Sequence, residues 1–216
     1  MILDHLLIGT PDLNRSVNEF KARLGVGPTF GGSHPAHGTS NYLVRLGEQF
    51  YAEFIGPNAG GQVDELGQLV RDLPGERLIG VAFATSDLDA TARRARELGV
   101  SLEPAREDSR ETPEGKRVSW RLALFERRVF PGLIMFAIEW AGSSHPSLGG
   151  ARAELSELEI ITSNGVASTY VRELMKSDVP IVANGELTAL RCKIASAGGS
   201  VTYSSRYDPV FATDGG

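Results

Sequence analysis

The sequence is poor in cysteine, since Cys192 is the only one among 216 residues. A disulfide bond within the chain and a cysteine-rich zinc site are therefore both excluded. A chain without disulfides suits a reducing compartment, and we expect a cytoplasmic protein. Cys192 alternates with Leu190 and Ile194. This pattern predicts a small core residue, with a nucleophile as the alternative.

The sequence also lacks a long apolar run and a basic face. Its longest apolar stretch, residues 132–140, contains Glu139 and is too short to span a membrane, and we expect no signal peptide at the N-terminus. The formal net charge is −5. Nucleic-acid binding requires a cluster of basic residues on one face, and no such cluster stands out here. We therefore expect neither nucleic acid nor a membrane as a partner.

Three common catalytic fingerprints are missing as well. The sequence contains no P-loop, no Rossmann fingerprint and no nucleophile elbow. Nucleotide use and serine hydrolase chemistry are therefore not expected. What the composition does provide is 41% hydrophobic and 23% charged residues, which is typical of a globular protein with a sizeable core.

An internal repeat organises the first two thirds of the chain. Residues 5–26 align without a gap with residues 80–101, and each copy consists of an apolar run followed by a helical pattern. Asp12 and Asp87 stand where a helix N-cap is expected. Gly25 and Gly99 stand where the helices should end, because a left-handed C-terminal residue favours glycine. The same strand and helix are therefore predicted twice.

Three further strands are expected after each of these helices. We place them around residues 28–30, 40–46 and 50–55, and again around residues 102–106, 118–125 and 133–140, with a linker and a short helix at residues 63–73 between the copies. A third, weaker copy has strands near residues 158–162, 180–183, 187–194 and 201–204, with a helix after the first. The predicted class is α+β, with a paired βαβββ domain at residues 1–142, in modules of about 1–57 and 77–142, and an additional module at residues 153–216.

Short motifs accompany the repeat: Asp4-His5, Pro11-Asp12-Leu13, Gly31-Gly32-Ser33-His34, Tyr51-Ala52-Glu53-Phe54-Ile55, Ile138-Glu139-Trp140 and His145-Pro146. With them, the tandem units resemble the glyoxalase-like domain family of the vicinal-oxygen-chelate superfamily. The resemblance implies a curled mixed sheet around a cleft. It also implies a divalent metal ion, bound by one residue from the first and one from the last strand of each module.

Carried onto this chain, the four implied metal positions are His5, Glu53, Gly80 and Glu139. Glycine has no side chain, so one usual ligand is missing. One histidine with two carboxylates is chemically sufficient for Zn, Mn, Fe, Ni or Mg, and a lone carboxylate in an apolar strand needs a partner or a metal. The alternatives are a hydrogen-bonded His5 near a strand end and an ion pair between Glu139 and an arginine such as Arg121.

The remaining candidates lie near the glycine-rich segment at residues 31–38. Besides Glu139, we expect His34 to be catalytic, as a general base or as a replacement for the imidazole missing at position 80. Thr39 and Asn41 are candidates for binding a polar substrate. His37 and His145 are expected to be loop histidines without a role.

The resemblance and these residues together predict a metal-dependent enzyme of lyase, isomerase or dioxygenase type, acting on a small oxygenated substrate. The alternative is a metal-free protein that binds or sequesters a small ligand, as in resistance proteins, and the fold alone does not decide between them. We expect His5, Glu53 and Glu139 to converge in one cleft with His34 at its rim. We also expect a homodimer, because a third module without a partner module would expose an apolar face, unless it packs on the back of the first pair.

Overall fold

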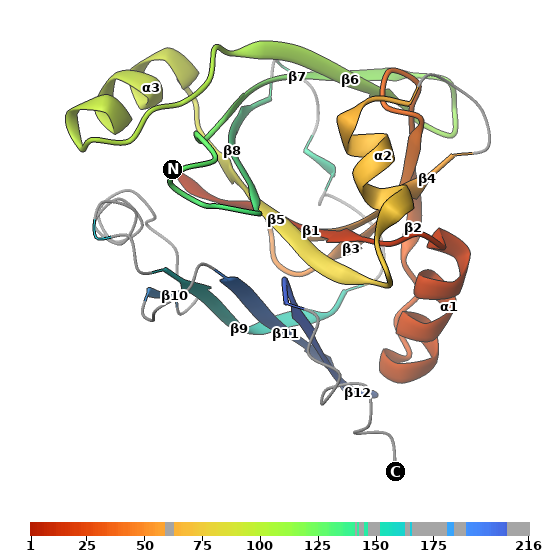
Figure 1. Ribbon diagram of the computed structural model, residues 1–216. Helices are drawn as coiled ribbons and strands as arrows, with labels where there is room; N and C mark the ends of the chain where they lie inside the picture. The colour runs from red at the N-terminus through yellow and green to blue at the C-terminus, as the bar shows by residue number, and fades with distance from the viewer. Residues whose placement is uncertain are drawn as a thin grey trace.

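The computed structural model describes residues 1–58, 63–140, 142, 145–146, 152–162, 165, 181–183 and 189–206. Within these residues the chain forms a closed barrel, a second sheet beside it and three helices (Figure 1). None of the described helices is long and apolar enough to cross a membrane.

The barrel contains the first eight strands in the order β1-β4-β3-β2-β6-β7-β8-β5. Along the chain its elements are β1 (Ile2–Gly9), α1 (Leu13–Leu24), β2 (Thr29–His34), β3 (Thr39–Arg45), β4 (Tyr51–Pro57), α2 (Glu65–Asp72), β5 (Arg77–Ala84), α3 (Leu88–Glu97), β6 (Arg106–Glu111), β7 (Arg117–Leu124) and β8 (Ile134–Glu139). The order of strand, helix and three strands occurs on each side of α2. In each half the first strand pairs in parallel with the last, β1 with β4 and β5 with β8.

The two halves meet along two seams of unequal length. β1 and β5 pair antiparallel along most of their length, whereas β2 and β6 share a single paired position, Ser33 with Glu111. Closure at the short seam depends on Gly32, because a Cβ atom there would lie 1.9 Å from the carbonyl oxygen of Glu111. The short seam therefore brings the residues of β6 close to the glycine pair in β2.

The helices begin and end where local sequence predicts. The side chain of Asp12 accepts a hydrogen bond from the backbone N–H of Arg15, and that of Asp87 accepts one from Ala90, so both act as N-caps. Gly25 ends α1 with a φ of 67°, a left-handed conformation that favours glycine. These predictions are confirmed because capping depends only on neighbouring residues.

Two strand predictions need correction. The strand expected at residues 102–106 lies instead at Arg106–Glu111, and Leu102 makes only an isolated bridge with Phe125. The apolar residues around 102 suggested a buried strand, but β6 is polar along its whole length. In addition, β2 continues to His34, so much of the segment expected to be a loop is strand.

The second sheet consists of β9 (Glu154–Ile161), β10 (Ile181–Ala183), β11 (Ala189–Ser196) and β12 (Gly199–Ser204), in the order β10-β9-β11-β12. It lies against the outside of the barrel beside β1 and β5 (Figure 1). One face carries apolar side chains that share a core cluster with the barrel, namely Leu158, Ile160, Leu190, Cys192 and Ile194 with Leu6, Ile8, Val81 and Phe83. The opposite face carries the ion pairs Glu157–Lys193 and Glu159–Arg191.

This arrangement changes two expectations about the C-terminal part. In the described sheet β9 pairs with β10 and β11, whereas the first strand of each barrel half pairs with the last, so a third module of the same build is not confirmed. Its expected helix lies outside the described residues. The apolar face that motivated a homodimer is covered by the barrel of the same chain. The homodimer therefore stays a prediction, without support from this surface.

Gly80 lies where β5 and β8 approach each other most closely. A Cβ atom at this position would lie 2.0 Å from the carbonyl oxygen of Ile134. No side chain, and hence no metal ligand, can be accommodated at position 80 without moving one of the two strands.

We predict that Gly80→Ala lowers the free energy of unfolding by about 2–3 kcal/mol, because the added methyl group forces β5 and β8 apart. Urea denaturation followed by circular dichroism measures this loss. The matched control is Gly75→Ala, where an added Cβ meets nothing within 4 Å and little change is expected. Equal stability of the two variants would contradict the prediction.

Candidate functional site

The inside of the barrel holds a cavity with an apolar wall and a polar floor. Including the part open to solvent, the empty space in it amounts to about 670 Å³. Its apolar wall is formed by Leu7, Ile55, Trp120, Leu122, Phe136 and Ile138. Its polar lining residues are His5, His34, His37, Asn41, Glu53, Arg106, Asp108 and Arg110.

Asp4 is a fully buried anion directly behind the cavity. Its carboxylate accepts hydrogen bonds from Nδ1 of His5 at 2.5 Å, Nε1 of Trp140 at 2.8 Å and Nε2 of His145 at 3.0 Å. Burial raises the pKa of Asp4, but the hydrogen bonds from His145 and His5 outweigh it and lower the pKa from 3.8 to about 2. An ionised carboxylate can only accept hydrogen bonds, so Nδ1 of His5 carries the hydrogen and Nε2 is left to face the cavity.

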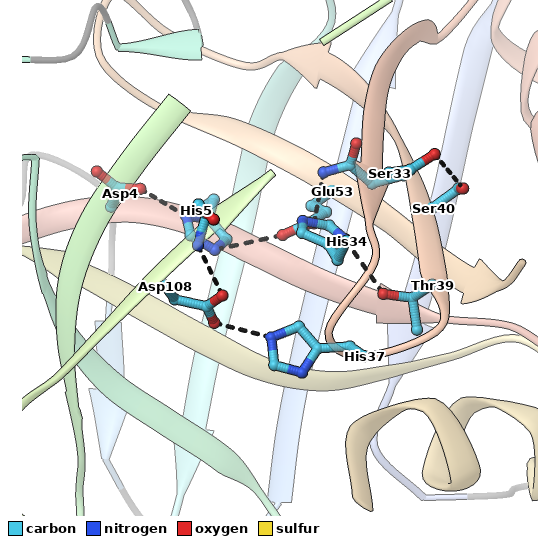
Figure 2. Close-up of polar contacts among 11 residues, drawn as sticks. Asp4, His5, Ser33, His34, His37, Thr39, Ser40, Glu53 and Asp108 are labelled. Atoms are coloured by element: carbon cyan, nitrogen blue, oxygen red, sulfur yellow. Dashed lines mark hydrogen bonds and ion pairs between the residues drawn. The ribbon is translucent and has the colours of Figure 1, made fainter. Parts of the chain in front are cut away.

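Glu53 stands opposite that nitrogen. Its Oε2 lies 3.5 Å from Nε2 of His5, and its Oε1 accepts a hydrogen bond of 2.7 Å from Nδ2 of Asn41. Figure 2 shows the Glu53 carboxylate between His5 and His34, whose Nε2 lies 4.0 Å from Oε1. Glu53 is only 7% exposed. A carboxylate is thus held in a largely apolar cavity, with one oxygen anchored by an amide and the other facing an imidazole nitrogen.

His34 is a neutral histidine next to this carboxylate. Its Nδ1 lies 3.1 Å from Oγ1 of Thr39, and burial lowers its pKa below the ordinary value of 6.5. Thr39 is fully buried behind the imidazole ring and does not line the cavity. Thr39 therefore orients His34, and the cavity is presented with an uncharged imidazole.

His37 forms a bridge between two carboxylates, which we call the His37 bridge. Its Nδ1 lies 2.6 Å from Asp64 and its Nε2 lies 2.9 Å from Asp108. The hydrogen bond to Asp108 is the largest cause that raises the pKa of His37 to about 9, so the ring is cationic at neutral pH. Asp64 also caps α2 through the backbone N–H of Gly67. The bridge thus joins the turn after β2 to α2 and to β6.

The structure brings together four of the residues singled out from the sequence, and it separates one. His5, Glu53, His34 and Asn41 all line the cavity, although His34 is buried in it and is not at its rim. Glu139 faces away from the cavity. Its Oε2 lies 3.2 Å from Nη1 of Arg121 and accepts a hydrogen bond from the backbone N–H of Leu88 at the start of α3.

The expected convergence of His5, Glu53 and Glu139 is therefore corrected by the strand register. His5 pairs with Tyr51, and its repeat equivalent Gly80 pairs with Ile134. Glu53, two residues after Tyr51, thus corresponds to Phe136. Glu139 lies three residues further on, and an odd offset places a side chain on the opposite face of a strand.

The donor set for a divalent metal is incomplete for the same reason. Two of the four implied positions are Gly80 and, by register, Phe136, and neither offers a ligand atom. Among the residues that the structure describes, no group of three or more His, Cys, Asp or Glu side chains is placed to hold a metal ion. A four-ligand metal site does not fit these residues, and no step below is derived through a metal.

Sequence reasoning missed the residues that β6 contributes. Arg106, Asp108 and Arg110 point to the cavity at a spacing of two. That alternation of polar residues was the available signal, but β6 had been placed too early in the chain. His37 and His145, expected to have no role, each contact a buried or partly buried carboxylate.

The His37 bridge predicts a pH-dependent stability. A raised histidine pKa stabilises the folded protein fully below pH 6.5, and this stabilisation is lost as the pH rises through about 9. The pKa values of Asp64 and Asp108 are lowered. Their contribution to the stability of the folded protein is therefore present above their ordinary pKa of 3.8 and is lost as the pH falls below it. The bridge is therefore strongest between these limits, in mildly acidic solution.

We expect His37→Gln to lower the free energy of unfolding at pH 6 by up to about 3 kcal/mol, a value that follows from the pKa rise from 6.5 to about 9. The difference from the wild type should shrink as the pH approaches 10. Denaturation curves at several pH values measure it. Asp72→Asn, which changes an exposed carboxylate of α2 outside the bridge, is the control. A difference that does not vary with pH would refute the proposed bridge.

Comparisons with known proteins show what this chain is similar to. Residues 3–174 match the family described as the glyoxalase-like domain, and no match was found among curated proteins. A solved structure of a hypothetical protein from Staphylococcus aureus is similar with a TM-score of 0.66 and 16% identity, over 87% of each chain.

Two methylmalonyl-CoA epimerases show a weaker likeness. The Streptomyces coelicolor enzyme, solved with 2-nitronate-propionyl-CoA, is 21% identical over 67% of this chain and 97% of its own, with a TM-score of 0.48. The Mycobacterium tuberculosis enzyme is 24% identical over 64% of this chain and 87% of its own, also with a TM-score of 0.48. At such identities the structural likenesses concern the fold alone. The family match covers most of the chain and agrees with the resemblance seen in its motifs, so the chain belongs to the glyoxalase-like domain family.

Proposed function

We propose that the protein is an enzyme that moves a proton at a carbon atom next to a carbonyl group of a small oxygenated substrate. The observation that carries this proposal is the Glu53 carboxylate, anchored by Asn41 and faced by Nε2 of His5 inside the barrel cavity. A positioned carboxylate in an apolar site is a suitable general base for such a proton. The reaction class is an isomerase or a lyase.

Each polar group has a defined part in this step. Glu53 takes the proton through Oε2 while the electron pair of the broken C–H bond forms a double bond to the carbonyl carbon and the π electrons of the carbonyl group move onto its oxygen. His5 receives or returns that proton through Nε2, because Asp4 keeps the hydrogen on its Nδ1. The proton then returns to the same carbon or to its neighbour, so that no atom or electron is gained or lost.

His34 supports the developing negative charge on oxygen. Its lowered pKa keeps it neutral. When Nδ1 accepts the hydrogen of the Thr39 hydroxyl, the hydrogen of the ring is on Nε2 and is available to a substrate oxygen. This role replaces that of a general base, which a histidine with a lowered pKa performs less well near neutral pH.

In this mechanism, two βαβββ modules of the barrel face one cavity. The first module supplies the proton-transferring groups His5, His34 and Glu53. The second supplies the apolar wall around Phe136 and Ile138, which excludes water from the reacting atoms. A metal-dependent form of the hypothesis, including a dioxygenase, would retain only His5 and Glu53 of the implied ligands.

A binding protein without catalytic activity is the second candidate. The observation that favours it is the aromatic part of the cavity, where Trp120 and Trp140 lie with ring centroids 5.6 Å apart. Such a wall binds a flat or apolar ligand without any chemical step.

We predict that Glu53→Gln abolishes proton exchange, with a loss of at least about 100-fold, because general-base catalysis contributes this much. The measurement is hydrogen–deuterium exchange by NMR in D₂O, with a panel of small 2-hydroxy and 2-oxo carbonyl compounds. Glu139→Gln is the matched control, since it changes the carboxylate that faces away from the cavity, and it should retain the activity. Full exchange by Glu53→Gln would contradict the role of Glu53 as the base, whereas no exchange by the wild type alongside tight binding would favour the binding protein.

The same assay tests metal dependence. Protein dialysed against a chelator is compared with protein supplied with Zn²⁺, Mn²⁺, Fe²⁺, Ni²⁺ or Mg²⁺, and bound metal is measured by elemental analysis. Exchange that survives dialysis supports proton transfer by the side chains alone. Exchange that returns only with one metal would contradict it.

A further inference from the structure

Among the residues that the structure describes, Arg110 is a buried cation that forms no ion pair with a carboxylate. Its side chain lines the cavity and is 8% exposed, and its Nη1 makes no hydrogen bond within the described residues. No described carboxylate forms an ion pair with it. Glu114, an exposed residue of the hairpin after β6, is affected by Arg110 only through the weakest of the causes that lower its pKa.

The other charged groups of the cavity have partners. Asp108 is paired with His37, and Glu53 is held by Asn41 and faces His5. Arg106 stands at the exposed end of β6. Among the buried charges that line the cavity, Arg110 thus stands out as uncompensated, and a buried unpaired charge is costly unless a ligand neutralises it.

A second unpartnered atom lies close by. Oδ1 of Asn41 accepts no hydrogen bond within the described residues. If a Cβ atom were added at Gly31, it would lie 2.5 Å from this oxygen. A Cβ atom added at Gly32 would lie 3.2 Å from Nη1 of Arg110. The two atoms therefore flank neighbouring glycines of β2. One is a charged donor and the other is an acceptor, and both are buried without a hydrogen-bond partner among the described residues.

We propose that the cavity binds a small 2-hydroxy carboxylic acid, with the carboxylate on Arg110 and the hydroxyl group donating to Asn41. The substrate class rests on the proposed function, because it assumes that the ligand of this cavity is also the substrate of Glu53. A guanidinium group binds a planar carboxylate through paired hydrogen bonds. A single arginine beside the carboxylates of Glu53 and Asp108 favours a monoanion over a phosphate dianion.

The experiment uses the fluorescence of the protein itself. The chain has two tryptophans, Trp120 and Trp140, and both line the cavity, so a bound ligand changes their emission. The probe is mandelate, which combines a carboxylate, a hydroxyl group and an aromatic ring that suits the apolar wall. Mandelamide removes the negative charge, phenylacetate removes the hydroxyl group, and phenylphosphonate replaces the whole hydroxyacetate group by a phosphonate.

We expect mandelate to bind at least about tenfold more tightly than mandelamide, and several-fold more tightly than phenylacetate, because each analogue leaves one polar atom unpaired. Arg110→Met should remove the preference for the acid over the amide, and Arg110→Lys should retain part of it. Arg117→Met changes an exposed arginine of β7 outside the cavity and should bind like the wild type. Ligand-free Arg110→Met should melt at the same or a higher temperature than the wild type, since it loses an unpaired buried charge.

Two results would overturn the proposal: equal affinity of the wild type for mandelate and mandelamide, or tighter binding of phenylphosphonate than of mandelate. If Arg110→Met does not fold, the acid-to-amide ratio of the wild type and of Arg110→Lys decides. Binding is measured without turnover, so the outcomes remain separable. A carboxylate preference without Glu53-dependent exchange would remove only the catalytic proposal, and exchange without the preference would remove only this one.

Discussion

The carboxylate of Asp4 has no exposed surface, and it stays ionised inside the protein because three nitrogen atoms donate to it. The donors come from β1, from the residue after β8 and from position 145, so one anion ties the first strand of the barrel to the chain beyond its last strand. The same charge selects the tautomer of His5. Without it, either ring nitrogen could carry the hydrogen, and the nitrogen facing Glu53 would have no defined role. The orientation of His5 toward Glu53 thus depends on a residue that does not line the cavity.

The sequence predicted those parts of the fold that depend on near neighbours. The caps at Asp12 and Asp87 and the helix end at Gly25 require only residues within one turn, and the repeat predicted three strands after each helix, although it placed β6 too early in the chain. The face of a strand is a different matter, because it depends on register to the single residue. Glu53 and Glu139 look equivalent when two apolar strands are compared, yet pairing through Tyr51 and Ile134 shows that the equivalent of Glu53 is Phe136. The sequence did not reveal that Glu139 lies three residues beyond the position equivalent to Glu53. This odd offset places the Glu139 carboxylate on the opposite face of its strand.

The polar strand β6 was missed for a related reason. A barrel strand is recognised by its apolar residues, and the segment Arg106–Glu111 has none. Its alternate side chains line the cavity, and they are charged. The same charges made the segment difficult to recognise as a strand in the sequence. The second sheet shows the opposite case. Its alternation was readable in Leu190, Cys192 and Ile194, but alternation shows only that one face is covered, and not by what. The cover is the outer face of the barrel, a contact between segments far apart in the chain.

The two halves of the barrel therefore share a topology but not a chemistry. Where the first half has His5 and Glu53, the second has Gly80 and Phe136, and at Gly80 the close approach of Ile134 leaves no room for a side chain at all. The second half therefore lacks ligands at two positions. At Gly80 the backbone of Ile134 excludes any side chain, so a single substitution would not supply a ligand there. What the second half contributes instead is an apolar wall and the uncompensated charge of Arg110 on β6. In the proposed complex, this charge holds the ligand in the same cavity that Glu53 and His5 line. Orientation by a fixed cation, and proton transfer by a carboxylate fixed through Asn41, are separate tasks that separate halves of one barrel can perform.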